Sequence, residues 1–430
     1  MRCSLRPPIK TLRLSKTGRA AGLCLLGSLW VATPATALEA NPATIVAKST
    51  TADEGIRFSC DADRLHTLET EMQGYLQSLG IRPDLVVKKV DREAGTAIYM
   101  LATVKDDTNT LDFYRRPSFA VGREVVALPT KTGRTRKVIT VSKKEILLAL
   151  MQHGRLTEFP ASACDIEALK DHIGVRQNIV AWVERLAWVW PDGDSARWNT
   201  RFWNKGTPKP GAEVVAAFMD AFQAQNQYAI GCFTATKLAF AHGVVDYYGR
   251  IKQDTERARL VQDRLLADGD PLVRVEPGNM WSFEEDFDRA IAAPPGKLLR
   301  LTEGVAPKNF VPGDWAYLLN TDPVSNQKTG YEGSNAIYLG HNRFDDYYND
   351  NNHAYTYQQK LDEVYQWRHG VFSRTRDFKK IRKLSRRDLE RLGATPEAGG
   401  LILPIRATPY LFGYTTLPAV GTGTRLASSP

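Results

Sequence analysis

The spacing of hydrophobic residues predicts short helices and hairpins in the first half of the chain. One set of apolar residues recurs every three or four positions and predicts a helix that ends at Gly80: Leu65, Leu68, Met72, Leu76 and Leu79. Runs of apolar residues around turn signals predict two hairpins, with strands at 85–87 and 97–101 and at 125–128 and 138–141. Helices are then expected at 143–152 and 164–186.

The same periodicities predict two helices and then two strands in the second half. A helix at 212–224 precedes Cys232, which opens the next helix. Apolar residues fall on one face of that helix and indicate an amphipathic element: Leu238, Ala241, Val245, Tyr248 and Ile251. Short strands are expected near 314–319 and 335–339.

This order of elements predicts an α+β fold with two domains. We expect a small α+β domain at 56–189, a catalytic domain at 190–415, a flexible lead-in at 38–55 and a disordered tail at 416–430. Tryptophans mark the junction of the two domains: Trp182, Trp188, Trp190, Trp198 and Trp203. Such a density usually buries area between layers or domains, and the alternative is that some of these rings line a substrate groove.

The N-terminus has the pattern of an export signal. Six basic residues and no acidic one precede position 20, an apolar run follows at 20–32, and Ala35-Thr36-Ala37 offers a cleavage site. We therefore expect a signal peptide at 1–37 and an exported protein, periplasmic or secreted, without stable membrane insertion. An uncleaved N-terminal anchor is the alternative. Removal of the signal would reduce the net charge from +9 to about +3, which is too little to argue for a nucleic-acid partner.

Cysteine is the residue type that points to chemistry. Three of the five cysteines follow the predicted cleavage site, and Cys60 and Cys164 have similar neighbours, so we expect these two to form a disulfide. Cys232 then remains free at the start of a helix, where unpaired N–H groups lower a thiol pKa. The alternative is a buried and inert cysteine. The cysteines lack zinc spacing and no calcium loop is present, so we expect no metal and no cofactor.

Several blocks around Cys232 resemble one enzyme family, in the same order along the chain. Residues 209–212 are similar to its Lys-Pro-Gly-Val, 228–235 to its Tyr-Ala-Leu-Glu-Cys-Ala-Thr-Ala, 311–314 to its Pro-Gly-Asp, and 331–340 to its Trp-Gln-Gly-Glu-Asn-Val-Ile-x-Leu-Gly. The family is the calcium-independent bacterial transglutaminases of spore coats, protein-glutamine gamma-glutamyltransferases, and the similarity covers roughly residues 195–370. The resemblance implies a papain-like or NlpC-like thiol enzyme fold with Cys232 as the nucleophile.

The acid and base partners of that family do not carry over. Gly231 and Ser334 stand where the family has glutamates, and Tyr347 falls near its later histidine. Alternation along a strand places Glu332 and Ser334 on one face. If residues 341 and 342 form a two-residue turn, we expect Ser334, Ala336, Tyr338, Asp345 and Tyr347 to share the face that meets Cys232.

The catalytic candidates are therefore Cys232, Glu332, Asp345 and Ser334, with Asp346 replacing Asp345 if the turn is one residue longer. His341 and His353 are less favoured alternatives for the base. Trp203 and Tyr331 are the candidates for substrate binding.

The resulting hypothesis is acyl transfer from a protein glutamine to an amine, through a thioester on Cys232. A carboxylate would move the protons, and the partners would be proteins with accessible Gln and Lys residues. Two alternatives remain at this point: a cell-wall amidase or peptidase of the NlpC type that uses the same thiol, and a non-catalytic scaffold with the same fold.

Overall fold

The computed structural model covers the chain from residue 55 to residue 409 with ten gaps. The described residues exclude 104–108, 154, 192–195, 205, 210, 268–298, 303–308, 329–330, 349–353 and 372–381. They belong to one compact unit, Lys48–Pro430. The predicted signal peptide, nearly all of the lead-in, the tail and His353 lie outside the described residues.

The first part of the fold is a four-stranded sheet covered by a helix. The strands are β1 (Gly55–Ser59), β2 (Val86–Asp91), β3 (Thr96–Leu101) and β6 (Leu156–Phe159), in the order β2-β3-β1-β6. The β2–β3 pair confirms the first predicted hairpin. Helix α1 (Ala62–Ser78) confirms the predicted helix: Asp61 caps its first turn, and Gly80 follows its end with a φ of +63°.

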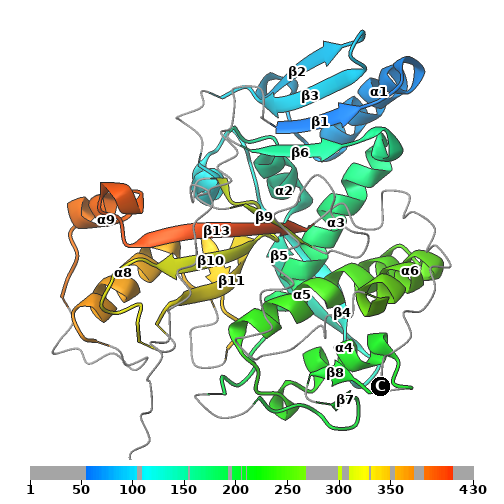
Figure 1. Cartoon of the computed structure of the whole chain (residues 1–430). Coiled ribbons are helices and arrows are strands. Elements are labelled where there is room, and N and C mark those ends of the chain that lie inside the picture. The colour runs from blue at the N-terminus through cyan, green and yellow to red at the C-terminus, as the bar shows by residue number, and fades with distance from the viewer. Residues whose placement is uncertain are drawn as a thin grey trace, which may run out of the picture. The chain divides into compact units, whose positions relative to one another are not determined.

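The second predicted hairpin forms a separate two-stranded sheet, β4 (Arg123–Pro129) and β5 (Thr135–Val141). It is followed by α2 (Lys143–Leu150) and α3 (Ile166–Val183), close to the predicted bounds. Helix α3 is buried along nearly all of its length because β5, α2 and α5 pack around it. It is therefore the central helix of this part of the fold (Figure 1).

Four helical segments and a short β-ribbon occupy the middle of the chain. The ribbon pairs β7 (Trp203–Asn204) with β8 (Thr207–Pro208), and the helices are α4 (Val214–Gln223), α5 (Cys232–Asp246), a π-helical turn (Tyr247–Ile251) and α6 (Thr255–Ala267). Helix α5 was predicted to be amphipathic, with one buried face. In the structure, all of its residues after Cys232 are buried. A Cβ on Gly243 would lie 2.4 Å from Ile179 of α3, so glycine permits the close approach of α3 and α5.

An antiparallel five-stranded sheet completes the fold. Its strands are β9 (Leu299–Thr302), β10 (Trp315–Asn320), β11 (Gly333–Gly340), β12 (Arg343–Asp345) and β13 (Ile402–Pro409), in the order β12-β11-β10-β13-β9. Strands β10 and β11 confirm the two predicted strands. Ile337 and Leu339 of β11 join the hydrophobic cluster of α3 and α5, whereas Ala336 and Tyr338 join a second cluster with α8 (Tyr357–Arg368) and α9 (Arg386–Leu392). The sheet is therefore covered on both faces (Figure 1).

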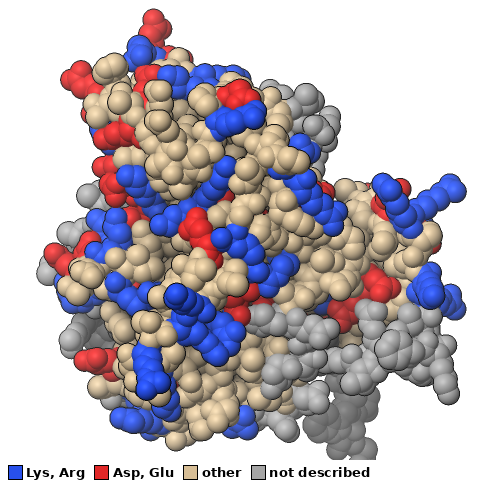
Figure 2. Space-filling view, turned by 180° about the vertical axis from the view of Figure 1, so that it is seen from behind, with Lys and Arg blue, Asp and Glu red and all other residues tan. Residues whose placement is uncertain are grey.

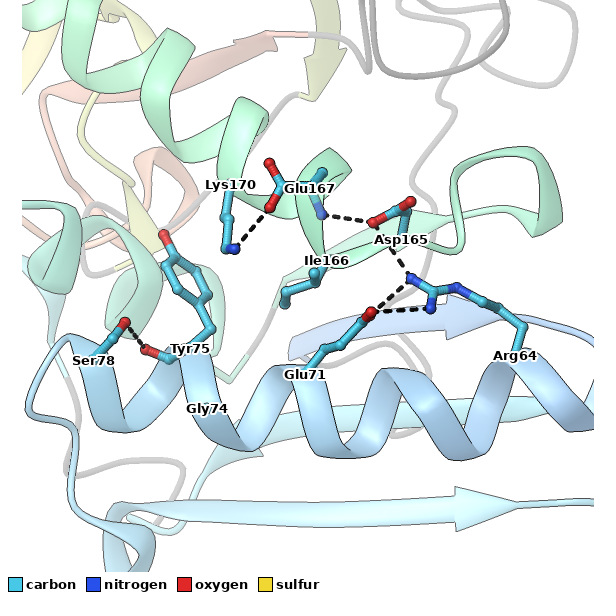
Figure 3. A pocket seen from close by; sticks show the side chains of 9 residues that line it. All are labelled: Arg64, Glu71, Gly74, Tyr75, Ser78, Asp165, Ile166, Glu167 and Lys170. Carbon is cyan, nitrogen blue, oxygen red and sulfur yellow. Dashed lines mark hydrogen bonds and ion pairs between the residues drawn. The ribbon is translucent and has the colours of Figure 1, made fainter. Parts of the chain in front are cut away.

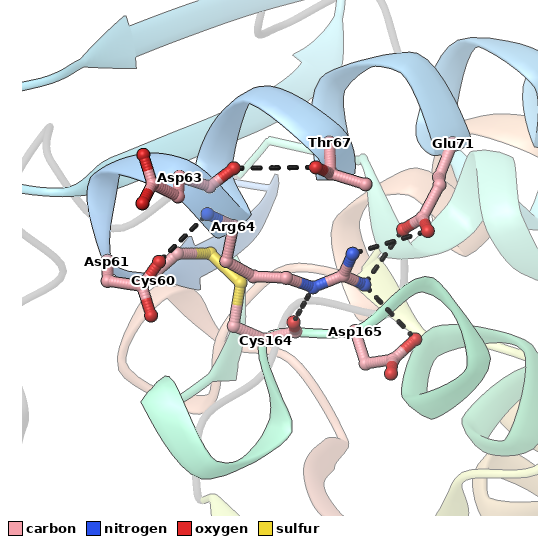
Figure 4. Close-up of a disulfide and its surroundings, with 8 residues drawn as sticks. All are labelled: Cys60, Asp61, Asp63, Arg64, Thr67, Glu71, Cys164 and Asp165. Atoms are coloured by element: carbon pink, nitrogen blue, oxygen red, sulfur yellow. Dashed lines mark hydrogen bonds and ion pairs between the residues drawn. A yellow bond between two sulfur atoms is a disulfide. The ribbon is translucent and has the colours of Figure 1, made fainter.

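A disulfide joins Cys60 and Cys164, as predicted, and leaves Cys232 as a free cysteine. It connects the start of α1 to the turn before α3 (Figure 4). Arg64 strengthens the same junction, because its guanidinium donates to the Cys164 carbonyl at 2.9 Å and pairs with Glu71 at 2.8 Å.

The mixture of helices and sheets confirms the α+β fold class. Residues on both sides of position 189 contribute to one hydrophobic cluster, which extends from Ile56 to Tyr348. The division into two domains at this position stays a prediction. Within the described residues, no helix is long and apolar enough to cross a membrane.

Candidate functional site

Cys232 is the first residue of α5, and the side chain is partly exposed. Its carbonyl accepts a hydrogen bond from Thr236 Oγ1 at 2.8 Å, one turn along the helix. Gly231 precedes it with a φ of −71°, which any residue can adopt. The helix start therefore does not require glycine at position 231.

The sulfur of Cys232 has a hydrogen-bond partner on β11. Asn335 Nδ2 lies 3.2 Å from Cys232 Sγ, and Trp315 Nε1 on β10 donates to Asn335 Oδ1 at 2.8 Å. An indole N–H can only donate, so it fixes the oxygen of the Asn335 amide on its own side. The NH₂ group of the amide must then face the sulfur.

Asn335 and Trp315 are site residues that the sequence reasoning missed. Asn335 lies within the block that resembles the family, and it is a buried amide in a strand whose following residues are apolar. A polar residue in such a run was the available signal, because buried amides need specific partners. Trp315 carried no comparable signal, since its contact with Asn335 crosses between paired strands.

Burial raises the pKa of the Cys232 thiol above its ordinary value. The side-chain and backbone N–H groups of Asn335 and the backbone of Phe233 oppose this increase, and the negative charge of Asp346 adds to it. The sequence predicted a pKa lowered by the helix N-terminus. The structure corrects this, because desolvation of the sulfur exceeds the stabilisation of the thiolate.

The hairpin of β11 and β12 explains which residues face Cys232. The two-residue turn is present, since Gly340 pairs with Arg343 and both turn residues have φ above 50°. A register shift between Tyr338 and Gly340 then pairs Tyr338 with Phe344, and Ile337 with Asp345. The extra residue on β11 moves Asp345 to the face of Ile337 and Phe344 to the face of Tyr338, which reverses the prediction for β12.

The predicted face is also wrong for β11, because its other face packs against α5. Asn335 approaches the thiol, and Ile337 and Leu339 share its face, whereas Ala336 and Tyr338 face the second cluster. Because the side chain of Ser334 alternates with that of Asn335, it lies on the face turned away from Cys232.

Two adjacent carboxylates follow β11. Asp345 is fully buried, which raises the pKa of its carboxyl well above the ordinary value, and it accepts from the Tyr347 backbone N–H at 2.7 Å. Asp346 is 8% exposed, and its charge acts on the Cys232 thiol. The negative charge of Asp346 is therefore one of the groups that raise the pKa of the Cys232 thiol.

Tyr347 closes the site from the same segment. Its φ of +77° is a strained value for a residue with a side chain, and such strain concentrates at functional sites. Its hydroxyl lies 2.7 Å from Thr236 Oγ1, and its carbonyl accepts from Trp188 N at 2.9 Å. Burial raises the pKa of Tyr347 well above its ordinary value, so the phenol stays protonated.

The remaining predicted site residues lie in other surroundings. Ser334 accepts a hydrogen bond from Lys360 of α8 at 3.0 Å, and Glu332 is exposed just before β11. Tyr331 packs edge-on against Trp367 at 5.1 Å, and Trp203 is 1% exposed with its N–H bound to Tyr228. Their roles in catalysis or substrate binding stay predictions.

A pocket of about 650 Å³ lies between α1 and α3 (Figure 3). It is lined mainly by paired charges, including Arg64 with Glu71 and Lys170 with Glu167. Cys232 is not among its lining residues. The pocket therefore belongs to the junction of these helices rather than to the thiol site.

Comparison with known proteins places the chain in a family. A family model described as protein-glutamine gamma-glutamyltransferase matches residues 127–369. A transglutaminase from Geobacillus stearothermophilus, solved without its C-terminal extension, is similar at 19% identity and a TM-score of 0.37, over 59% of this chain and 98% of that one. No curated protein matches the chain. The family model spans more than half of the chain and does not single out spore-coat members. This chain therefore belongs to the protein-glutamine gamma-glutamyltransferase family, and it is an acyltransferase with protein substrates.

Proposed function

We propose that Cys232 is the nucleophile of this gamma-glutamyl transfer. Its sulfur attacks the carboxamide carbon of a protein glutamine, the C–N bond breaks, and ammonia leaves with the proton that the thiol gave up. The amine of a lysine then attacks the thioester, an isopeptide bond forms, and the thiol is restored. The observation that carries the proposal is the free Cys232 at a helix start, with Asn335 donating to its sulfur and Asp346 acting on it.

Asp346 is the carboxylate that we propose as the acceptor of the thiol proton. The raised pKa of Cys232 means that the resting site holds a thiol, so the attack needs a base. Asp345 is less suited, because burial raises the pKa of its carboxyl and it accepts the Tyr347 backbone N–H. Glu332 remains the alternative from the sequence, and it is exposed outside the strand.

The oxygen of the tetrahedral intermediate needs donors at the same place. The first turn of α5 supplies backbone N–H groups that no helical carbonyl accepts, and the first of them is that of Cys232. These groups lie beside the sulfur and point toward the N-terminal end of the helix. We propose that they stabilise the negative charge that forms on the glutamine oxygen.

The cellular location is also proposed. The Cys60–Cys164 disulfide supports an exported protein, since such bonds persist in oxidising compartments. Together with the export pattern of residues 1–37, it favours the periplasm or the medium.

The decisive experiment measures incorporation of a labelled amine into a glutamine-containing protein. Cys232→Ala should reduce incorporation to background because no thioester forms. Thr234→Ser is the matched control, because it changes a buried residue of α5 two positions after Cys232, and it should retain activity. Release of ammonia with and without the amine separates cross-linking from deamidation. Cleavage of cell-wall peptides without any amine incorporation would favour the amidase alternative and overturn the proposal.

A further inference from the structure

The β4–β5 hairpin concentrates positive charge. Residues 123–143 contain six basic residues and one acidic residue, Glu124. We call the segment 123–141 the basic hairpin. Four of its cations are exposed around the turn and on β5: Lys131, Arg134, Arg136 and Lys137. Five basic residues and one acidic residue give the basic hairpin a net charge of +4.

These four cations have no acidic partner within the described part of the chain. Glu124 is engaged elsewhere, accepting from Lys143 N at 2.9 Å and from Gln177 Nε2 at 2.7 Å. Glu184, which pairs with Arg123 of the hairpin, is also held by Arg343. Instead of an acid, Arg136 has a second cation beside it: desolvation and the charge of Arg136 together lower the pKa of Arg185.

An exposed apolar pair lies within this charged surface. Val125 and Ile139 are direct cross-strand partners, and they are 60% and 57% exposed. Lys137 lies two residues before Ile139, on the same face of β5. In Figure 1 the hairpin lies behind α3 and α5, and Figure 2, which is seen from behind, shows Lys and Arg side chains spread over that face with Asp and Glu among them. The surface therefore offers both charge and apolar area.

The hairpin is held firmly by the body of the enzyme. Strand β5 packs on α3. Gln223 of α4 donates to the Pro129 carbonyl at 3.2 Å, and Arg250, in the turn after α5, donates to the Ala127 carbonyl at 3.1 Å. A partner bound to the hairpin is thus fixed relative to α4 and α5, the helices next to the thiol.

We propose that the basic hairpin is a docking surface for acidic segments of the protein substrates. The proposal rests on the gamma-glutamyltransferase function, because it names the charge class of protein that this enzyme captures. Its physical basis is charge complementarity with unpaired cations, which accelerates encounter and is screened by salt.

An acidic polypeptide fits this surface better than a bilayer does. Elements that insert into membranes present their apolar residues together on one broad face toward the lipid. Here only two large aliphatic side chains are exposed in the middle of the strands, and the turn at 130–134 is polar and charged. A chain with spaced carboxylates can reach the cations on both faces and at the turn.

The test measures binding in a Cys232→Ala background, where no reaction occurs. The probes are a fluorescent glutamine peptide that ends in six Asp residues and the same peptide with six Ser. At low salt we expect the acidic peptide to bind about tenfold more tightly, and the difference to vanish at high salt. Arg136→Glu/Lys137→Glu should abolish the preference, and so should Lys131→Glu/Arg134→Glu, which changes the turn instead.

The matched control is Lys89→Glu/Lys383→Glu, an equal change of charge at exposed positions elsewhere in the chain. This variant should retain the preference for the acidic peptide. Equal binding of the two peptides to the parent protein, or an equal loss in the control, would overturn the proposal. So would hairpin-dependent binding to phosphatidylglycerol vesicles without a preference for the acidic peptide.

The two proposals fail in distinguishable ways. Peptide binding by the Cys232→Ala protein does not depend on any chemical step, so it tests the docking surface alone. Amine incorporation into the Ser peptide tests the proposed nucleophile alone, and the hairpin variants should leave that rate unchanged.

Discussion

The reactivity of the Cys232 thiol depends on neighbours that act in opposite directions. Burial and the charge of Asp346 favour the protonated sulfur, whereas N–H groups of Asn335 and Phe233 favour the thiolate. A thiolate formed in advance would need no base. A protonated thiol beside a carboxylate implies instead that the proton moves as the sulfur attacks.

Replacement of Asp346 separates these two effects. In Asp346→Asn the thiol pKa should fall, because a negative charge next to the sulfur is removed. Turnover should nevertheless decrease by about 100-fold, because the proton acceptor is lost. The pH dependence of alkylation by iodoacetamide reports the pKa, and amine incorporation reports turnover. Unchanged turnover would exclude Asp346 as the base.

The amide of Asn335 can be tested through the same alkylation assay. Asn335→Ala removes a donor to the sulfur, so the thiol pKa should rise and alkylation at fixed pH should slow by about tenfold. Trp315→Phe keeps the ring that packs on Phe233 but loses the N–H that orients the amide, and a smaller change in the same direction is expected. If alkylation is unaffected in both variants, Asn335 does not position the thiol.

At the scale of elements, the hairpin of β11 and β12 is fixed at its tip by α2. Glu145 of α2 accepts from the His341 backbone at 2.9 Å, and its other oxygen lies 3.1 Å from His341 Nε2. A Cβ on Gly340, with a φ of +82°, would lie 2.8 Å from the same carboxyl group. The position of the hairpin that carries Asn335 and Asp346 therefore depends on a contact with the first half of the chain.

This contact predicts a pH effect on stability. Burial raises the pKa of Glu145 from 4.5 to about 7, so between these values the folded protein holds a proton that the unfolded protein releases. Stability from this group is complete below pH 4.5 and is lost as pH rises through 7. Burial and the charges of Arg123 and Arg343 lower the pKa of His341 to about 4. Stability from His341 therefore changes with pH in the opposite direction, because it increases as pH rises. His341 is common to the two proteins compared in the test.

Glu145→Gln keeps the hydrogen-bonding shape and removes the ionisation. Relative to the parent protein, its free energy of unfolding should improve by about 2.5 kcal/mol between pH 5 and pH 8. Urea denaturation at the two values measures this difference. A difference that stays constant with pH would mean that Glu145 titrates normally.

For the whole molecule, the disulfide is the covalent constraint with the longest reach. It joins residues 104 positions apart and ties the first sheet to α3, the central helix. Closing so long a loop restricts the unfolded chain, and loss of such a bond typically lowers stability by about 2–5 kcal/mol.

A double variant Cys60→Ser/Cys164→Ser should therefore unfold at a lower temperature, measured by calorimetry. Below that transition it should keep its amine incorporation, because Cys232 is not part of the bond. Reductant should lower the melting temperature of the parent protein but not of the variant. Equal melting temperatures would show that the bond contributes little.

Local pattern was sufficient for much of the fold. The periodicity of α1, the turn residues of the hairpins and the neighbours of Cys60 and Cys164 each reflect short-range chemistry, and each prediction is confirmed. The sequence blocks around Cys232 were sufficient to identify the family, because the motifs of a family are short runs of residues that can be compared directly. These features depend on residues close together in the chain, so the sequence by itself determined them.

The environment of the thiol was decided only by the tertiary structure. Packing of β11 on α5 turned Asn335 instead of Ser334 toward the sulfur, and a register shift near Leu339 decided which residues of β12 share that face. Because the sheet is packed on both faces, no apolar pattern revealed either of these. Burial of Cys232 reversed the expected direction of its pKa shift. Strand register and desolvation both arise from partners far away in the chain, and for that reason no local pattern could contain them.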